Sequence, residues 1–154
     1  QGTDTGELLK QGWDVIAIDK EKEAKTIMLK KFSKYCKKNL KIIIEPMEKI
    51  TIPKVSLINA SFSLPFCNPN NFLALWNKII SNISPGGIFC GQLFGPDDSW
   101  ASNKNMTFHN RNLLDSLFSN FIMHYLHEEN KISKTATGEV KNWHVFHLVA
   151  VKQK

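Results

Sequence analysis

The stretch that decides the fold covers residues 2–19, which read GTDTGELLKQGWDVIAID. It combines a glycine-containing turn at Gly2–Thr5, a helical segment ended by Gly12, and the apolar run Val15–Ile18 that stops at Asp19. An acidic residue at that distance from a glycine-rich turn suits a nucleotide ribose, because two carboxylate oxygens can accept hydrogen bonds from both hydroxyls. Asp19 also has a local alternative role, since it can cap the helix that follows it.

Length and composition are those of a globular protein with one domain. The 154 residues, 42% hydrophobic and 22% charged, suffice for a sizeable core. No apolar run approaches the roughly 18 residues of a membrane-spanning helix, and no secretory leader pattern opens the sequence. The three cysteines are far apart and lack CxxC spacing, which argues against a disulfide framework or a cysteine zinc site. We therefore expect a soluble protein in a reducing compartment, the cytoplasm, without a membrane partner.

The net charge of +6 comes almost entirely from lysine, because Arg111 is the only arginine. Nine lysines fall between Lys20 and Lys41. Such a run can be an electrostatic footprint for phosphates, or it can be the solvated face of a helix. Arginine is the residue that usually makes bidentate phosphate or base contacts. We therefore do not expect a nucleic-acid partner.

Short apolar runs rich in β-formers alternate with segments of helical period, which predicts an α/β fold with a largely parallel sheet. The last two strands should pair antiparallel, since only a polar connection containing Gly138 separates them. The final strand should lie inside the sheet, because apolar residues occupy both of its faces. The expected strands cover residues 15–19, 42–44, 55–61, 88–94, 121–128 and 142–152, and the expected helices cover residues 7–10, 21–37, 72–83 and 113–118.

Histidines occur in pairs three residues apart, His124 with His127 and His144 with His147. On a helix this spacing would favour a metal site, but in a strand it places the two rings on opposite faces. We therefore expect no metal, although one cross-strand pair can meet. His109, His144 and His147 are candidates for a base by their chemistry alone, and no catalytic residue is assigned.

Several segments resemble the class I S-adenosylmethionine-dependent methyltransferases, from the third glycine of their GxGxG turn to their ribose-binding acid. Three further blocks are similar to a bacterial subgroup related to tellurite-resistance and small-molecule methyltransferases. The resemblance implies a Rossmann-like three-layer sandwich with a mostly parallel sheet and an antiparallel last strand, formed by residues 1–154 as one domain. The segments are Gly2–Thr5, Leu8-Leu9, Gly12–Val15 and Ala17–Asp19, and the blocks are Asp98–Ala101, Met106–His109 and Trp143–His147. Pro85–Gly87, which precedes a strand, is similar to a turn that is usual in the family.

By this resemblance the cofactor is S-adenosylmethionine. The first turn would lie along its methionine portion, the end of the first strand would hold the ribose, the end of the second would contact adenine, and the end of the third would line the sulfonium. Glutamate in place of the family's usual aspartate, followed by proline, departs from the pattern at the adenine position. The residues concerned are Gly2, Thr3 and Asp4, then Asp19 and Lys20, then Glu45, Pro46 and Met47, and finally Asn59, Ala60 and Ser61.

The acceptor side is expected at Phe62, Phe66, Trp100 and His109. The loop of residues 95–109 is long and polar for an α/β connection, so we expect it to be mobile without ligand. Residues 59–62 also resemble faintly the NPPY motif of enzymes that methylate bases, but both prolines are absent.

The expected activity is transfer of the cofactor's methyl group to a small-molecule acceptor. The alternatives are a catalytically silent cofactor-binding or scaffold protein with the same fold, and a methyltransferase that acts on nucleic acid or protein. A nicotinamide-dependent oxidoreductase shares the glycine-to-aspartate spacing but not the antiparallel final pair of strands. Neither the acceptor nor the oligomeric state follows from the sequence.

In the family's fold a central strand precedes the glycine turn and lies between the strands that end at Asp19 and near Ser61. The sequence given begins after that strand, at Gln1. Neighbouring strands would otherwise bury unpaired backbone groups, at about 1–3 kcal/mol each. We therefore expect the native chain to extend upstream, and we do not expect strands 15–19 and 55–61 to pair directly.

Overall fold

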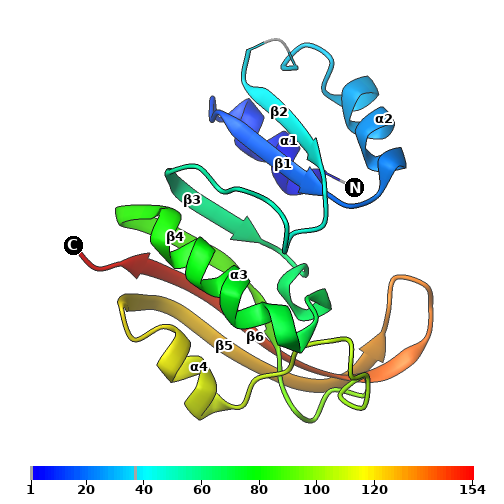
Figure 1. The fold of residues 1–154 in the computed structure, drawn as a ribbon. Helices are drawn as coiled ribbons and strands as arrows, with labels where there is room; N and C mark the ends of the chain where they lie inside the picture. Colours follow the sequence, from blue (N-terminus) through cyan, green and yellow to red (C-terminus); the bar gives the residue numbers. More distant parts are fainter. Residues whose placement is uncertain (1, 37) are drawn as a thin grey trace. The chain divides into compact units, whose positions relative to one another are not determined.

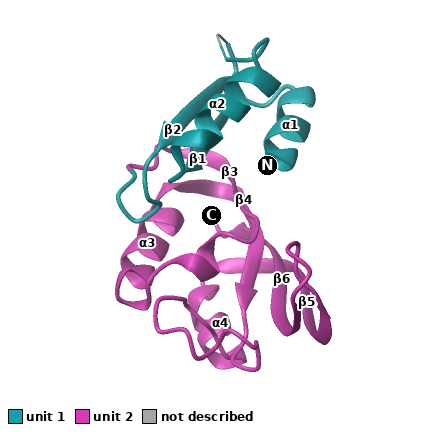
Figure 2. Ribbon diagram, turned by 90° about the vertical axis from the view of Figure 1, so that its right-hand side faces the viewer, with its two compact units in different colours: residues 1–50 teal, residues 51–154 magenta. Residues whose placement is uncertain are grey.

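The computed structural model describes residues 2–36 and 38–154. Contacts divide the chain into two compact units, residues 1–50 (unit 1) and residues 51–154 (unit 2), which Figure 2 colours separately. Each unit has its own sheet, with two strands in the first and four in the second. Within the described residues, no helix is long and apolar enough to cross a membrane.

Unit 1 contains one parallel pair of strands and two helices. Its elements are α1 (Thr3–Lys10), β1 (Val15–Asp19), α2 (Lys22–Lys31) and β2 (Leu40–Ile44). The strands pair from Val15 opposite Leu40 to Asp19 opposite Ile44. The buried core consists of Leu9, Ala17, Met28, Phe32 and Leu40.

The end of α1 is set by Gly12, as predicted. Its φ of 86° is in the left-handed region that glycine adopts without strain. The N–H of Gly12 donates to the Leu9 carbonyl at 3.2 Å, and the N–H of Trp13 donates to the Leu8 carbonyl at 3.1 Å. These two bonds form a Schellman motif, which closes the last turn of the helix.

Helix α2 is shorter than predicted, because it ends at Lys31 and not at residue 37. After the helix, the Tyr35 carbonyl accepts hydrogen bonds from the N–H groups of Lys38, Asn39 and Leu40, which turns the chain into β2. Tyr35 and Cys36 still pack against the core from this turn. The helical spacing of apolar residues therefore extends past the end of the helix, because the turn also packs side chains on the core.

Unit 2 is a mixed sheet of order β3-β4-β6-β5. Strands β3 and β4 are parallel, and the other two pairings are antiparallel. The final strand lies between β4 and β5, which confirms its predicted place inside the sheet. The elements are β3 (Val55–Ala60), η1 (Leu64–Phe66), α3 (Pro69–Asn82), β4 (Ile83–Phe94), α4 (Arg111–Leu117), β5 (Phe121–Lys134) and β6 (Val140–Lys152).

Three strands of unit 2 are longer than predicted. β4 begins at Ile83, and its pairing with β3 changes register between Val55 and Leu57, where the turn Pro85–Gly87 is accommodated. β5 and β6 pair as far as Lys134 opposite Val140, well beyond the strand β4 that ends at Phe94. The charged and polar residues of this hairpin hide the alternation that would predict a strand.

Helices α3 and α4 cover one face of the unit 2 sheet (Figure 1). Trp76 of α3 is 2% exposed, and its ring lies 5.1 Å from Phe89, 4.9 Å from Phe118 and 6.3 Å from Phe121, measured between centroids. Its indole N–H donates to the Leu117 carbonyl at 3.2 Å. Trp76 thus links α3 to β4, β5 and the end of α4.

Strands β1 and β3 belong to different sheets. The pairings of the described residues contain none between these two strands. This agrees with the expectation that these two strands do not pair directly.

Candidate functional site

The carboxyl ends of β1 and β2 lie side by side, because the two strands are parallel. The N–H of Glu45 donates to the Asp19 carbonyl at 3.0 Å, which joins the two ends directly. Figure 1 shows that α1 begins at this same end of the sheet. Unit 1 therefore brings together the predicted cofactor residues Gly2, Thr3, Asp4, Asp19, Lys20, Glu45, Pro46 and Met47.

The Asp19 carboxylate has one oxygen in local use. Oδ1 accepts the N–H of Glu21 at 2.9 Å, and Glu21 is the N-cap of α2. Oδ2 accepts no hydrogen bond from any residue that the structure describes. The bond forms a local turn before α2 and does not cap the helix, because it reaches the N-cap residue itself and not an N–H of the first turn. Oδ2 is left for a ligand.

Gly2 has a structural requirement of its own. It has a φ of 69°, and a Cβ on it would lie 3.1 Å from Cε2 of Phe32. Any larger residue at this position would therefore press against the Phe32 ring of unit 1.

The end of β3 carries the remaining predicted cofactor residues, Asn59, Ala60 and Ser61. Ala60 lies against Gly91 of β4 so closely that a Cβ on Gly91 would stand 2.8 Å from the Ala60 carbonyl oxygen. The next residue, Phe62, has a φ of 45° and donates its N–H to Oε1 of Gln92 at 3.0 Å. This bond fixes the turn at the end of β3.

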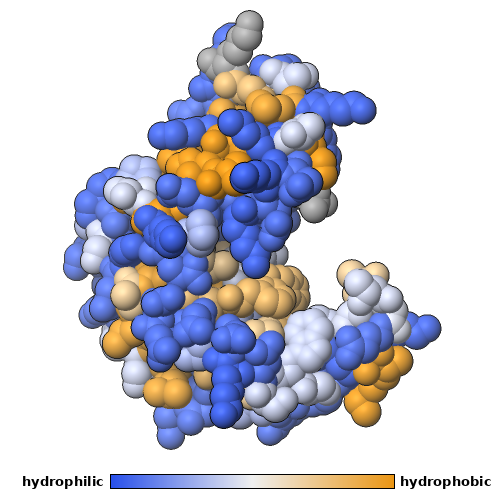
Figure 3. Space-filling model, turned by 45° about the vertical axis from the view of Figure 1, so that its right-hand side comes forward, coloured by the Kyte–Doolittle hydropathy of each residue, from blue (hydrophilic) through white to orange (hydrophobic). Residues whose placement is uncertain are grey.

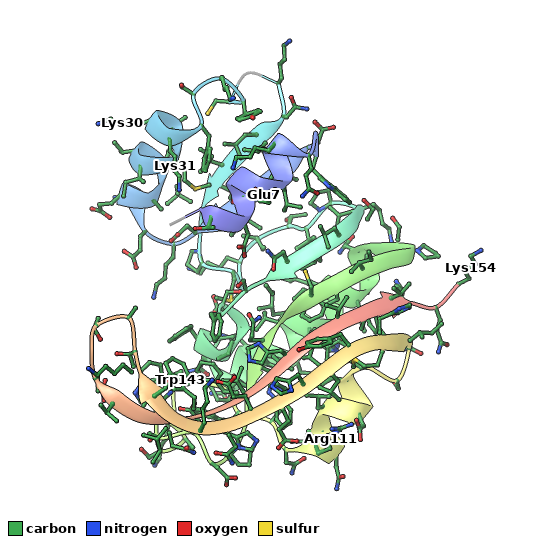
Figure 4. All side chains as sticks on the ribbon, turned by 180° about the vertical axis from the view of Figure 1, so that it is seen from behind. Glu7, Lys30, Lys31, Arg111, Trp143 and Lys154 are labelled. Carbon is green, nitrogen blue, oxygen red and sulfur yellow. The ribbon has the colours of Figure 1, made fainter. Side chains whose placement is uncertain are left out.

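Five aromatic side chains of unit 2 form one connected aromatic cluster with Phe94 at its centre. Its members are Phe62, Phe66, Phe94, Trp100 and Trp143. Two of them are on the surface, since Phe62 is 44% and Phe66 is 49% exposed. Phe62 lies 6.3 Å from Trp143, and Phe66 lies 6.4 Å from Trp100, between ring centroids. Figure 4 labels Trp143, and Figure 3 shows apolar patches among the hydrophilic side chains of the face it presents. The cluster joins predicted acceptor residues Phe62, Phe66 and Trp100.

The loop of residues 95–109 is hydrogen-bonded along its length. The N–H of Gly95 donates to the His144 carbonyl at 2.7 Å, and Ser99 and Asn142 exchange two bonds of 3.0 Å and 2.9 Å. The N–H of Thr107 donates to the Pro65 carbonyl at 2.9 Å. These anchors argue against the mobility expected from its polarity.

His109 does not have the place expected of an acceptor residue. It is 5% exposed, and its ring lies 4.5 Å from the Phe72 ring of α3. Burial lowers the pKa of its imidazole to about 4. The polar sequence around it suggests an open loop, but the backbone N–H of His109 donates to the Phe94 carbonyl at 2.8 Å and the ring packs on α3. The structure therefore gives it a packing role.

The other two histidine candidates differ in what their rings bind. His144 is buried, with Nδ1 accepting the N–H of Asp97 at 3.1 Å and Nε2 lying 2.9 Å from Oε1 of Glu128. His147 is partly exposed, its ring lies 6.3 Å from Phe62, and neither ring nitrogen has a hydrogen-bond partner among the described residues. Of these two histidines, His147 is the one with ring nitrogens that bind no other described residue.

Metal-binding residues do not cluster in the described part of the chain. It holds no group of three or more His, Cys, Asp or Glu side chains that could bind a metal ion. The rings of His127 and His147 do meet across β5 and β6, at 6.0 Å between centroids. In the described part of the chain, no disulfide joins Cys36, Cys67 and Cys90.

No protein-family model and no curated protein sequence matches the chain. Solved structures do. TehB from Haemophilus influenzae superposes with a TM-score of 0.83 at 14% identity over 99% of this chain. The N-methyltransferase NodS from Bradyrhizobium japonicum WM9 gives 0.75 at 10% identity over 99% of this chain and 81% of its own. The 1,6-didemethyltoxoflavin-N1-methyltransferase from Burkholderia thailandensis gives 0.70 at 15% identity over 99% of this chain and 67% of its own.

The chain has the class I methyltransferase fold. The expected α/β, Rossmann-like architecture is confirmed by these superpositions. The chain spans 54% of the length of the TehB chain that it matches.

Within this methyltransferase fold, sequence reasoning missed part of the aromatic cluster. The sequence places Trp143 in a block of family resemblance and Phe94 in an expected strand, but it assigns neither residue to the acceptor side. Gln92 and Lys141 were not singled out at all. Alternation along β4 and β6 could have placed Phe94, Trp143 and Gln92 on one face, because Phe94 pairs with Val145 and Gln92 with His147. Nothing in the sequence indicates the partner of Lys141.

Proposed function

We propose that the protein is an S-adenosylmethionine-dependent methyltransferase that acts on a small-molecule acceptor. One observation carries the proposal: in a methyltransferase fold, the start of α1, Asp19 and Glu45 gather at the carboxyl ends of β1 and β2. Ligands of open α/β sheets bind at this end of the strands. The Burkholderia neighbour, which contains S-adenosylhomocysteine and 1,6-didemethyltoxoflavin, supports both the cofactor and a small-molecule acceptor.

The residues present fit this cofactor. Asp19 keeps Oδ2 for a ribose hydroxyl, and Glu45 with the backbone after it would contact the adenine. The sulfonium of S-adenosylmethionine supplies an electrophilic methyl group when bound. The protein then has to orient the acceptor, exclude water and accept a proton from it. Phe62 and Phe66 would exclude water, and His147 would accept the proton from an O–H, N–H or S–H acceptor.

Replacing Asp19 by asparagine is expected to weaken binding of S-adenosylhomocysteine by about 1–3 kcal/mol, or roughly 5- to 150-fold, because a charged acceptor of hydrogen bonds is lost. Asparagine still offers Oδ1 to the N–H of Glu21, so the fold should persist. Isothermal titration calorimetry measures the affinity, with NAD as a second ligand. The Glu7→Gln variant, which alters an exposed acid on α1, is the matched control. An unchanged affinity in Asp19→Asn would show that Asp19 only shapes the turn.

Methyl transfer should depend on the neutral form of His147. Burial lowers the pKa of His147 below its usual 6.5, while Glu129 raises it and His127 and Lys131 lower it further. The rate is therefore expected to rise with pH below 6.5 and to level off by neutrality. Transfer of labelled methyl to catechol, histamine and thiophenol measures it.

In His147→Gln the rising limb should disappear and kcat should fall at least about 100-fold. His127→Gln, the neighbouring ring, is the control and should keep the limb. If His147→Gln retains both rate and profile, the proton leaves by another route.

A further inference from the structure

Lys141 of β6 is a lysine inside the protein. Its side chain is 1% exposed, and it forms an ion pair with Asp98, whose side chain is fully buried. Desolvating an ammonium and a carboxylate costs several kcal/mol per ion, which their attraction offsets only with good geometry and further hydrogen bonds. A pair of apolar residues would often be as stable there. The ion pair therefore calls for an explanation other than stability.

The anion is fixed in place by three donors. Asp98 accepts the Lys141 ammonium and the N–H of Trp100 at Oδ1, the latter at 3.0 Å, and the N–H of His144 at Oδ2, at 3.2 Å. Two of these donors belong to β6 and one to the loop of residues 95–109. Asp98 thus ties the loop to the strand at the position of Trp100.

The cation lies in a box of aromatic rings. The Lys141 ammonium nitrogen is 3.5 Å from the ring centroid of Trp100, 4.0 Å from that of Trp143 and 5.1 Å from that of Phe94. A cation attracts the faces of aromatic rings, and indole most strongly. The ammonium therefore favours one orientation for each indole, which simple packing would not impose.

The same indoles support the exposed rings of the aromatic cluster. Trp143 meets Phe62 at an interplanar angle of 79°, and Trp100 meets Phe66 at 54°. Both exposed rings also lie 6.3 Å from Phe94. An orientation set at Lys141 is thus passed by direct ring contacts to Phe62 and Phe66.

We infer that Asp98 and Lys141 are positioning residues: their buried ion pair holds the Trp100 and Trp143 indoles, and through them the Phe62 and Phe66 rings at the acceptor side. The assignment of this side to the acceptor rests on the proposed function. The contacts from the ion pair to the two phenylalanines do not.

The test uses the neutral pair Asp98→Asn with Lys141→Met, which leaves no unpaired buried charge. Nuclear magnetic resonance reads the indole N–H signals of Trp100 and Trp143 and the amide signals of Phe62 and Phe66. All four are expected to move by several linewidths, while the indole signals of Trp13 and Trp76 stay. Arg111→Met, which removes an exposed ion pair with Asp115 on α4, is the control and should move none of them. Unmoved Phe62 and Phe66 signals in the neutral pair would overturn the inference.

A rescue experiment separates charge from volume. Lys141→Ala removes the atoms that n-propylammonium contains, so that ion should return the four signals to their wild-type positions in a saturable manner. The alcohol 1-propanol has similar size without the charge and should fail. Equal rescue by both would mean that Lys141 only fills space, which overturns the inference. Wild-type binding of S-adenosylhomocysteine, measured separately, decides the proposed function whichever way the signals move.

Discussion

Truncation of Trp76 to alanine is expected to lower the free energy of unfolding of unit 2 by about 3–5 kcal/mol. The ring is almost fully buried among Phe89, Phe118 and Phe121, and its N–H bond to the Leu117 carbonyl is lost with it. The cavity lies where α3, the sheet and the end of α4 meet, so no single element can move to close it. Hydrogen exchange of the β4 and β6 amides reports the loss for unit 2 alone.

The control is another tryptophan, Trp13, which is 37% exposed in unit 1. Trp13→Ala should leave the exchange of β4 and β6 unchanged, because Trp13 belongs to unit 1. A loss below about 1 kcal/mol in Trp76→Ala would place the centre of the core elsewhere, since whole aromatic side chains cost more than this when truly buried.

The second large effect is expected at the buried ion pair. Asp98→Asn leaves the Lys141 ammonium without its counter-charge among aromatic rings, which should cost about 3–5 kcal/mol in unfolding free energy. Adding Lys141→Met to this variant should recover most of the loss, because the uncompensated charge is removed. Denaturant titration of the two single variants and the double variant gives the coupling energy.

The exposed pair of Arg111 with Asp115 is the reference for this cycle. Nε of Arg111 lies 3.2 Å from Oδ1 of Asp115, and the two side chains are 53% and 61% exposed. Such exposed pairs contribute about 0–1 kcal/mol to the free energy of unfolding. Additive losses in the Asp98 and Lys141 cycle would contradict a direct interaction between those two side chains.

The predictable parts of this structure are those with a local pattern. Gly12 predicts the end of α1, and the apolar run at Val15–Ile18 predicts β1, because both signals depend only on residues close in sequence. The mismatch at α2 has the opposite cause, since the partly buried Tyr35 packs on the core from a turn and continues the helical spacing by coincidence. Burial alone does not distinguish helix from turn.

The candidate site was predictable only where its residues follow consecutive parallel strands. Asp19 and Glu45 meet because β1 and β2 are parallel, and parallel pairing follows from the helix between them. Lys141 and Asp98 meet only in three dimensions, and a lysine in a polar hairpin is ordinarily solvated. The burial of His109 was not predictable for the same reason, because sequence polarity says nothing about which way a loop turns its side chains.

Phe62 holds a bulky ring outward on a left-handed backbone, at a φ of 45°. For residues other than glycine this conformation costs about 1–2 kcal/mol, and here the bond from the Phe62 N–H to Gln92 maintains it. A laboratory selection for heat resistance alone would thus favour glycine at position 62. Such a selection would remove an aromatic ring from the surface while making the molecule hardier, so thermostability and ligand recognition compete at this one residue.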